Sequence, residues 1–246
     1  MDKYCFGVDL GGTTVKIGLF SIEGQLQDKW EIPTRTENHG AEILSDIAAS
    51  IQRRMDTGHL SKEQVTGIGI GVPGPVLNEN IVQGCVNLGW GNVRVADELS
   101  ALTGLKVKAA NDANVAALGE QWQGGGKGFQ NLVMFTLGTG VGGGIIQNGR
   151  IISGANGAAG EIGHMVIVDS DEVVGTCGCG HRGCLEQVAS ATGIVNLTEK
   201  NLAECSQDSV LRDISPLTAK DVLDAAKAGD ALAEQAAENM MKHLGR

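Results

Sequence analysis

Asp112 lies in the segment Ala110-Asn111-Asp112-Ala113-Asn114, at the point where a strand pattern ends and a helix pattern begins. A carboxylate at such a point can accept hydrogen bonds from the first N–H groups of the helix while it faces a cleft. An ordinary helix cap is the alternative interpretation, because aspartate is a favoured cap residue. Asn111 offers both a donor and an acceptor to a substrate hydroxyl. This pair therefore favours Asp112 as the base that takes the proton of an attacking hydroxyl.

A glycine-rich turn beside an acid occurs near the N-terminus, in Asp9-Leu10-Gly11-Gly12-Thr13-Thr14-Val15-Lys16. Glycines let backbone N–H groups approach phosphate oxygens, threonine hydroxyls add donors, and Asp9 at a strand end can orient hydrated Mg²⁺. A plain hairpin turn is the alternative, but such a turn needs only one or two glycines and no adjacent carboxylate. We therefore expect this first phosphate loop to bind ATP through Asp9, Gly11, Gly12, Thr13, Thr14 and Lys16.

A second glycine-rich turn, Gly138-Thr139-Gly140-Val141-Gly142-Gly143, satisfies the spacing G-x-G-x-x-G. The dinucleotide-binding fingerprint needs a helix next, whereas a strand-like run follows here, and no G-x-x-x-x-G-K-[ST] occurs. Leu137-Gly138-Thr139-Gly140 occupies the same place in its hairpin as Leu10-Gly11-Gly12-Thr13 does in the first. The chain therefore looks like a duplicated unit, with Gly138, Thr139 and Gly140 facing the first phosphate loop across one phosphate chain.

Three cysteines, Cys177, Cys179 and Cys184, lie on a short glycine-rich stretch. Together with His164 they form the Cys₃His set that binds zinc tetrahedrally. Unrelated buried cysteines and a redox pair are the alternatives, and His181 is a second candidate for the histidine ligand, although it lies inside the tight loop. A closed site with four protein ligands has no open position, so we expect the zinc to be structural.

Polar residues that can hold sugar hydroxyls cluster around the same loop. Each hydroxyl must be paired once water is expelled, and carboxylates and amides serve best. Glu161 and His164 lie in Gly160-Glu161-Ile162-Gly163-His164, and Glu186 comes two residues after Cys184. Asn87, in Asn87-Leu88-Gly89-Trp90, is a further candidate. We expect the zinc to order this wall of a sugar pocket without taking part in the chemistry.

Hydrophobic periodicity places these motifs on a mixed α/β sheet. A helix is expected over 41–55, with Ile43, Ile47 and Ile51 on one stripe, and another over Ala231–Leu244. Thr218 and Asp221 indicate a further helix start. Strands are expected at Tyr4–Leu10, Val15–Phe20, Leu26–Ile32, Val65–Val72, Leu105–Ala109, Leu132–Leu137 and Gly143–Gln147, and other helices at Val95–Thr103 and Asp112–Trp122.

Composition limits the possible partners. With 246 residues, a net charge of −10 and a pI near 4.9, the chain lacks the basic surface that nucleic acids or anionic membranes require. We expect no nucleic-acid or membrane partner. The N-terminal sequence shows no secretory signal, and no apolar run approaches the roughly 20 residues that span a bilayer. We therefore expect a cytoplasmic protein, in a compartment that keeps its cysteines reduced.

These motifs together resemble the ROK family of sugar kinases and sugar-responsive repressors, and within it the bacterial glucokinases. The residues that carry the resemblance are Asp9-Leu10-Gly11-Gly12-Thr13, Gly69-Ile70-Gly71-Val72-Pro73-Gly74, Asn111-Asp112-Ala113-Asn114, Gly138-Thr139-Gly140 and the stretch from Gly160 to Glu186. The stretch with the cysteines is the most specific. Where many members have an acid after the Pro-Gly turn, this chain has Leu77-Asn78.

The resemblance implies a two-lobed actin/hexokinase-like (ribonuclease H-like) fold, Mg²⁺-ATP, phosphorylation of the sugar at O6, and commonly a homodimer. It implies Asp112 as the base, sugar contacts at Gly74, Asn111, Asp112, Glu161, His164 and Glu186, and zinc at His164, Cys177, Cys179 and Cys184. We expect an N-terminal lobe over 1–110 and a C-terminal lobe over 111–246. Family members usually continue for tens of residues, with a strand that holds adenine and a closing helix, so we expect a C-terminally short form.

Glucose is the expected substrate, and its phosphorylation the entry step of glycolysis, because Asn87-Leu88-Gly89-Trp90 looks like the glucokinase branch. Fructose, mannose, allose and N-acetylmannosamine are alternative substrates. A non-catalytic sugar sensor is the alternative from another class. Repressors of the family carry an N-terminal DNA-binding module, for which we expect no room before Tyr4.

Overall fold

A computed structural model describes residues 3–245 of the chain. The chain divides into two compact units. The first contains the residues up to Val133 together with Gly144–Gly160, and the second contains Met134–Gly143 together with the residues from Glu161 on. The lobe boundary predicted at residue 110 stays a prediction, and Met1, Asp2 and Arg246 lie outside the described residues. Among the described helices, none is both long and apolar enough to cross a membrane.

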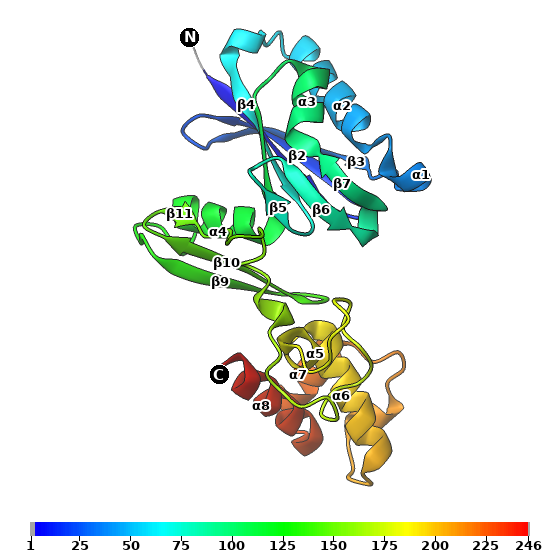
Figure 1. Ribbon diagram of the computed structural model, residues 1–246. Helices are drawn as coiled ribbons and strands as arrows, with labels where there is room; N and C mark the ends of the chain where they lie inside the picture. The colour runs from blue at the N-terminus through cyan, green and yellow to red at the C-terminus, as the bar shows by residue number, and fades with distance from the viewer. Residues whose placement is uncertain (1–2, 246) are drawn as a thin grey trace. The chain divides into compact units, whose positions relative to one another are not determined.

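The first unit is built on a five-stranded sheet with the order β3-β2-β1-β4-β8. β1, β2 and β3 form an antiparallel meander, whereas β4 and β8 lie parallel to β1 and to each other. Figure 1 shows these strands in the upper part of the view. Because the carboxyl ends of parallel strands share one edge, this edge collects the residues that follow β1, β4 and β8. The strands are β1 (Tyr4–Leu10), β2 (Thr14–Ser21), β3 (Leu26–Pro33), β4 (Val65–Val72) and β8 (Val107–Asn111).

Two helices cover one face of this sheet, α2 (Ile43–Thr57) and α3 (Val95–Thr103), which lie side by side in Figure 1. Alternate residues of β1, such as Phe6 and Val8, point into a core that also contains Ile47 and Ile51 of α2 and Leu99 of α3. The stripe predicted for residues 41–55 is therefore confirmed as a core face.

The opposite face of the sheet is hollowed into a groove of about 960 Å³. Its floor includes Gly7, Gly18 and Gly69, which are cross-strand neighbours, and Val115 and Leu118 of α4 (Asp112–Gln123) line its side. α4 begins at the residue after β8, so the candidate base Asp112 lies at the junction of this strand and this helix.

A small three-stranded sheet with the order β5-β6-β7 fills the chain between β4 and α3. This sheet was not predicted from the sequence, because its strands are short and interrupted by glycine and polar residues. A second three-stranded sheet has the order β11-β10-β9. The elements are β5 (Val76–Leu77), β6 (Ile81–Cys85), β7 (Trp90–Arg94), β9 (Leu132–Leu137), β10 (Val141–Gln147) and β11 (Arg150–Ile151), with the short helices α1 (Glu37–Gly40), η1 (Lys62–Gln64) and η2 (Val86–Leu88).

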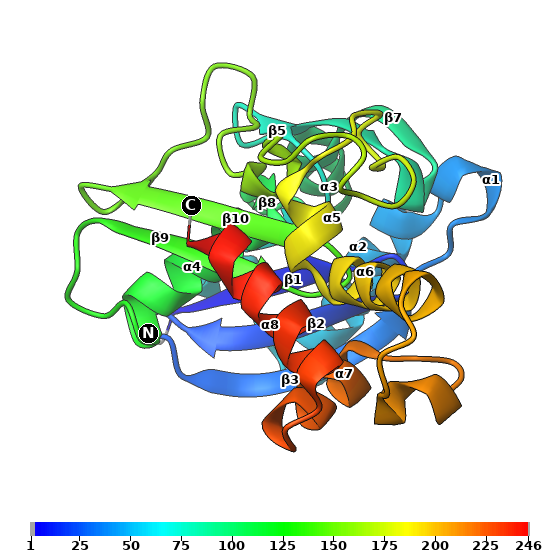
Figure 2. The same ribbon diagram turned by 90° about the horizontal axis from the view of Figure 1, so that it is seen from below.

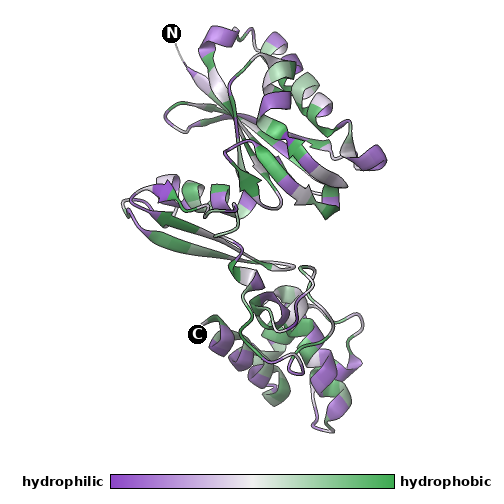
Figure 3. Cartoon of the chain, in the orientation of Figure 1, coloured by the Kyte–Doolittle hydropathy of each residue, from purple (hydrophilic) through white to green (hydrophobic). Residues whose placement is uncertain are grey.

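The second unit is mainly helical, and its core gathers Ile194, Leu211, Val222 and Leu232 from four successive helices. Figure 2 shows α6 and α8 in this unit, and Figure 3 shows hydrophilic and hydrophobic residues alternating along α8, as expected of a helix with one buried face. The elements are η3 (Ile162–His164), α5 (Leu185–Ala189), α6 (Ala191–Glu204), η4 (Val210–Asp213), α7 (Ala219–Lys227) and α8 (Ala231–Leu244).

Several predicted elements agree with the structure to the residue, including β1, β4, α3, β9 and α8. Thr218 begins α7 with the capping box expected from Asp221, whose N–H donates to the Thr218 hydroxyl. The strand predicted at Leu105–Ala109 lies two residues too early. Gly104 ends α3 in the left-handed region, and the Leu105 carbonyl accepts a hydrogen bond from Ser100 Oγ, so the strand begins only at Val107.

Candidate active site and metal centre

The first phosphate loop joins β1 to β2 and is held by a hydrogen bond within the loop and by another from Thr34. Gly11 N–H donates to the Thr14 carbonyl at 3.1 Å, and Thr34 Oγ1 donates to the Gly11 carbonyl at 2.7 Å. A Cβ on Gly11 would lie 2.9 Å from the Thr14 carbonyl oxygen, so the turn requires glycine there. Asp9 and Lys16 are cross-strand partners with 3.7 Å between carboxylate oxygen and ammonium nitrogen, and both side chains are exposed. This spacing is longer than the 2.7–2.9 Å of a strong charged hydrogen bond, so the Asp9 carboxylate stays available to a cation.

Asp112 is the first residue of α4, and its neighbours fix its place. The N-cap of the helix is Asn111, whose Oδ1 accepts a hydrogen bond from Asn114 N–H at 3.1 Å. Asn111 Nδ2 donates to the Gly74 carbonyl at 3.3 Å. Asp112 Oδ1 accepts from Ala113 N–H at 2.8 Å. Asn111, and not Asp112, is therefore the N-cap of α4. The Asn111 amide hydrogen-bonds to the turn after β4 and holds the neighbouring Asp112 next to that turn.

The environment of Asp112 favours a basic carboxylate. Part of the residue stays open to solvent, yet the protein around it removes enough water from the carboxyl to raise its pKa. The hydrogen bond from Ala113 N–H lowers the pKa, and the negative charge of Asp9 raises it. The net effect is a pKa above the usual range of aspartate, which suits an acceptor of protons.

Asn87 lies in η2, beside the first phosphate loop. A Cβ on Gly12 would be 3.8 Å from the Asn87 Cβ, so the two segments are in contact. Trp90, which is buried, anchors this segment by donating from Nε1 to the Gly40 carbonyl at 3.2 Å. Gly74 has a φ of +91°, which favours glycine at the turn. The first unit thus contains four of the predicted sugar contacts, namely Gly74, Asn87, Asn111 and Asp112.

The second glycine turn, Gly138–Gly140, joins β9 to β10 in the second unit. Gly138 N–H donates to the Gly140 carbonyl at 3.0 Å, and Ala191 N–H at the start of α6 donates to the Gly138 carbonyl at 2.8 Å. A Cβ on Gly140 would lie 2.5 Å from Oε2 of Glu186, so the carboxylate rests against the turn.

A polar pocket of about 190 Å³ next to this turn was not predicted from the sequence. Its lining is rich in hydroxyl and amide groups and has no lysine or arginine. The hydroxyl-rich run Ser190-Ala191-Thr192 after Glu186 was the signal available in the sequence. The lining includes Thr139, Thr176, Gln187, Ser190, Thr192 and Asn196.

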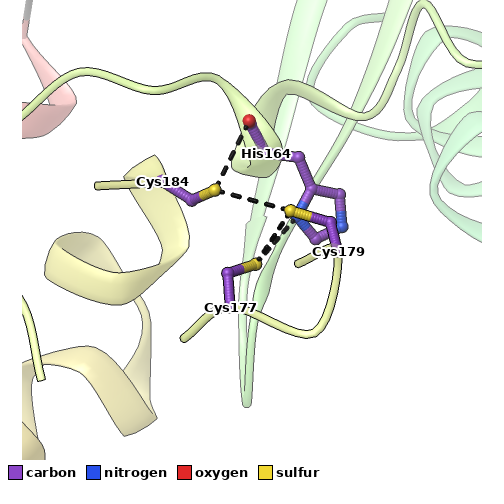
Figure 4. Close-up of side chains that lie close together, drawn as sticks. All are labelled: His164, Cys177, Cys179 and Cys184. Carbon is purple, nitrogen blue, oxygen red and sulfur yellow. Dashed lines mark hydrogen bonds between the residues drawn. The ribbon is translucent and has the colours of Figure 1, made fainter. Parts of the chain in front are cut away.

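The predicted zinc ligands lie together in the second unit, as Figure 4 shows. Ligand atoms of His164, Cys177, Cys179 and Cys184 all lie within 4.8 Å of one another. Cys179 Sγ is 3.3 Å from Cys177 Sγ and 3.6 Å from Cys184 Sγ. With zinc–sulfur bonds of about 2.3 Å, a tetrahedral site has sulfur–sulfur edges of about 3.8 Å, so the set fits zinc with only small shifts.

Local structure explains why these four residues meet. The Val166–Cys184 bridge places the segment after η3 beside the start of α5, where Cys184 is the N-cap. In the loop, Cys177 N–H donates to the His181 carbonyl at 2.9 Å, which closes a tight turn around Cys179. His181 Nδ1 lies 3.4 Å from Cys179 Sγ and is exposed, whereas His164 completes the cluster.

Two carboxylates touch the metal cluster. Glu186 Oε1 accepts from Cys177 Sγ at 3.0 Å and lies 3.7 Å from His164 Nδ1. Glu161 Oε2 lies 3.8 Å from His164 Nε2. His164 Nδ1 also lies 3.3 Å from Cys177 Sγ, so one ring nitrogen faces the thiols and the other faces Glu161. The structure brings the three predicted sugar residues of this unit, Glu161, His164 and Glu186, into one group.

A family model of the ROK family matches residues 5–246 of the chain. The chain belongs to the ROK family. The family and the α/β fold class with mixed sheets, predicted from the sequence, are thereby confirmed. Among related ROK proteins, a glucokinase of Halalkalibacterium halodurans is 44% identical over 99% of this chain and 74% of its own length. A glucokinase of Thermotoga maritima is 38% identical over 98% of this chain and 75% of its own length.

Solved structures of ROK proteins are similar to this one. The ROK family glucokinase of Streptomyces griseus in complex with glucose and AMPPNP matches with a TM-score of 0.73 and 30% identity, over 98% of this chain and 77% of that one. A ROK family transcriptional regulator, described as a homologue of the E. coli MLC protein, matches with a TM-score of 0.82 and 28% identity. This chain spans 60% of the length of that regulator.

Proposed function

We propose that this chain is a glucokinase, which transfers the terminal phosphoryl group of ATP to O6 of glucose at the entry of glycolysis. The observation that carries the proposal is the 44% identity to a glucokinase over 99% of this chain. The first unit agrees with it, because Asp9 near the end of β1 and Asp112 directly after β8 lie at the same edge of one sheet, with β4 between the two strands. ROK kinases for other hexoses (fructose, mannose, allose or N-acetylmannosamine) remain the alternative within the enzymes.

Asp112 acts as the base in this proposal. Its Oδ1 is held by Ala113 N–H at 2.8 Å, which orients the carboxylate and leaves Oδ2 to take the proton of the sugar 6-hydroxyl. The raised pKa strengthens the carboxylate as a proton acceptor. Such assistance is typically worth about 10²- to 10⁴-fold in rate. The hydrogen bond from Asn111 Nδ2 to the Gly74 carbonyl holds the start of α4, and with it Asp112, beside the Gly74 turn.

Asp9 would hold hydrated Mg²⁺ through its exposed carboxylate, because a hard cation prefers oxygen ligands and gives up its water reluctantly. When bound, Mg²⁺ neutralises charge on the phosphate oxygens of ATP. The turn formed by Gly11, Gly12, Thr13 and Thr14 supplies N–H and hydroxyl donors, and Lys16 adds a positive charge. Gly138, Thr139 and Gly140 provide a second set of donors to the phosphates.

Glu161, His164 and Glu186 would read the sugar hydroxyls, together with Gly74, Asn87 and Asn111. Zinc on Cys177, Cys179, Cys184 and His164 would be structural, because four protein ligands complete a tetrahedron. Its contribution to recognition would be to hold Cys184, the N-cap of α5, and thereby to place Glu186 in the first turn of that helix. The thiolates need a reducing compartment, which agrees with the predicted cytoplasmic location. We also propose that the chain forms a homodimer, as the family resemblance implies.

A sugar-sensing regulator is the second candidate. It is favoured by one observation, the TM-score of 0.82 to a ROK family transcriptional regulator. A sensor would bind the sugar but would form no phosphorylated product.

The test is product formation across a panel of hexoses with Mg²⁺-ATP. Coupling to glucose-6-phosphate dehydrogenase reports only glucose 6-phosphate, and a parallel ADP-release assay reports turnover of any sugar. We expect product from glucose, with lower kcat/KM for the other hexoses. ADP release with a different sugar alone would replace glucose as substrate, and sugar binding by calorimetry without any ADP release would support the sensor.

A further inference from the structure

Thr34 holds the first phosphate loop from outside, through two hydrogen bonds. It follows Pro33, the last residue of β3, and so lies just beyond the last paired residues of β2 and β3, which are Thr14 and Pro33. Thr34 N–H donates to the Thr13 carbonyl at 2.9 Å, and Thr34 Oγ1 donates to the Gly11 carbonyl at 2.7 Å. One half-buried residue thus fixes two carbonyls of the loop.

The bond to Gly11 replaces the one that would close the turn. In a β-turn of four residues, the first carbonyl often accepts a hydrogen bond from the N–H of the fourth residue. Here the four residues are Gly11 to Thr14, and the Gly11 carbonyl accepts from Thr34 Oγ1 instead. Within residues 3–245, Thr14 N–H donates to no carbonyl of this turn, and Gly12 N–H donates to no backbone carbonyl. Thr34 therefore keeps the turn open.

The planar peptide bond decides where the N–H groups of the open turn point. In a trans peptide the C=O and the N–H point in opposite directions. The Gly11 carbonyl and the Gly12 N–H belong to one peptide, so a carbonyl held by Thr34 directs this N–H away from Thr34. The same relation joins the Thr13 carbonyl to the Thr14 N–H. Gly12 is exposed, and neighbouring N–H groups of such a turn form a concave site for phosphate oxygens.

We propose that Thr34 is a positioning residue for ATP, which holds the Gly11 and Thr13 carbonyls so that the N–H groups on the far side of both peptides face the phosphate oxygens. The inference rests on the proposed kinase function, in which this loop binds the phosphates. Thr34 acts through the loop and not by contact with the nucleotide. Without the Thr34 hydroxyl, the Gly11 carbonyl is free to accept from Thr14 N–H, which closes the turn and removes one donor from the phosphates.

Three variants separate the hydroxyl from the rest of the side chain. Thr34→Val removes the hydroxyl, nearly preserves the shape of the side chain and keeps the N–H that donates to the Thr13 carbonyl. Thr34→Ser keeps the hydroxyl and should restore binding. Thr36→Val is the matched control, because Thr36 is the same residue type two positions along the chain, is exposed and makes no side-chain hydrogen bond as the N-cap of α1.

Calorimetry at 25 °C measures the affinity for Mg²⁺-AMPPNP and, in a separate titration, for glucose, and thermal unfolding reports the fold. We expect Thr34→Val to bind Mg²⁺-AMPPNP about three- to tenfold more weakly, the usual effect of one hydrogen bond, with glucose affinity within about twofold of wild type. Thr34→Ser and Thr36→Val should keep both affinities within about twofold. All variants should unfold within about 4 °C of wild type. A merely structural role would lower the unfolding temperature without separating the nucleotide from glucose.

Equal Mg²⁺-AMPPNP affinity in Thr34→Val and wild type would overturn the proposal. An equal loss in Thr34→Ser, or an equal loss of glucose affinity in Thr34→Val, would overturn it as well. If Thr34→Val does not fold, Thr34→Ala against Thr34→Ser gives the same comparison. A wild type that binds no Mg²⁺-AMPPNP would instead refute the proposed kinase function, and the role of Thr34 with it.

Discussion

Removal of one zinc ligand should destabilise the chain by a predictable amount. Cys184 is fully buried, and its Sγ lies 3.6 Å from Cys179 Sγ within the Cys₃His cluster. Structural zinc contributes on the order of 12 kcal/mol to small zinc domains, so one ligand of four accounts for about 3 kcal/mol if the ligands share it equally. For a chain of this size, about 3 kcal/mol corresponds to a fall of roughly 6–12 °C in the unfolding temperature.

The assay combines metal content by mass spectrometry with thermal unfolding, for wild type, Cys184→Ala and Cys205→Ala. Cys205 is exposed and outside the cluster, so it is the matched control and should leave both values unchanged. Wild type should contain one zinc per chain, and a chelator should lower its unfolding temperature below that of Cys184→Ala. Because three ligands still hold the metal in this estimate, the chelator should lower the unfolding temperature of Cys184→Ala further, close to that of chelated wild type. Wild type without zinc and indifferent to chelator would refute the reasoning.

Two further predictions concern the start of α4. Asn111→Ala should lower the free energy of unfolding by about 1–2 kcal/mol in urea denaturation, because the N-cap and the hydrogen bond to the Gly74 carbonyl are both lost; Asn111→Ser, which keeps a cap oxygen, should recover part of the loss, and equal values for Ala and Ser would contradict the cap assignment. Asp112→Asn should raise the free energy of unfolding at pH 7 and leave it unchanged near pH 3. The pKa of Asp112 is raised in the folded chain, so at pH values above the unfolded pKa of about 3.9 the carboxyl ionises more easily in the unfolded chain. Ionisation therefore costs the wild-type fold stability, and asparagine removes that cost. A loss of stability at pH 7 in Asp112→Asn would show that the carboxylate is favourable to the fold.

Strands with continuous apolar or alternating patterns were predictable from the sequence. β1 and β4 begin and end at the predicted residues, because alternation along β1 and the β-branched residues that alternate with glycine in β4 both indicate strands. The β5-β6-β7 sheet was missed for the opposite reason. Its strands have two to five residues and include Gly84 and Gly91, so no period is long enough to detect.

The chemistry of the site was predictable where residue type and spacing are specific. The spacing of the cysteines predicts a metal cluster, but the choice between His164 and His181 depends on the Val166–Cys184 bridge, which only the folded chain reveals. Asn111 and Asp112 are both good cap residues, so the sequence cannot separate cap from base. Backbone hydrogen bonds assign the cap to Asn111.

Glycines show the limit of sequence reasoning most directly. Gly67, Gly69 and Gly71 look alike in the sequence of β4, yet Gly67 has a positive φ and a close carbonyl neighbour, Gly69 is exposed with no close neighbour, and Gly71 is buried against Asp112 and Val115. Their separate roles depend on neighbours from β1, β8 and α4. Those neighbours are distant in the sequence and close only in the fold.

The most direct test of the account compares glucose 6-phosphate formation by wild type and by Asp112→Asn at saturating glucose and Mg²⁺-ATP. Calorimetry with glucose serves as the control for binding. We expect product from wild type and a kcat lower by about 10²- to 10⁴-fold in Asp112→Asn, with glucose affinity within a few-fold of wild type. A variant kcat within tenfold of an active wild type would contradict the assignment of Asp112 as the base, and a wild type that binds glucose but forms no product would contradict the proposed function itself.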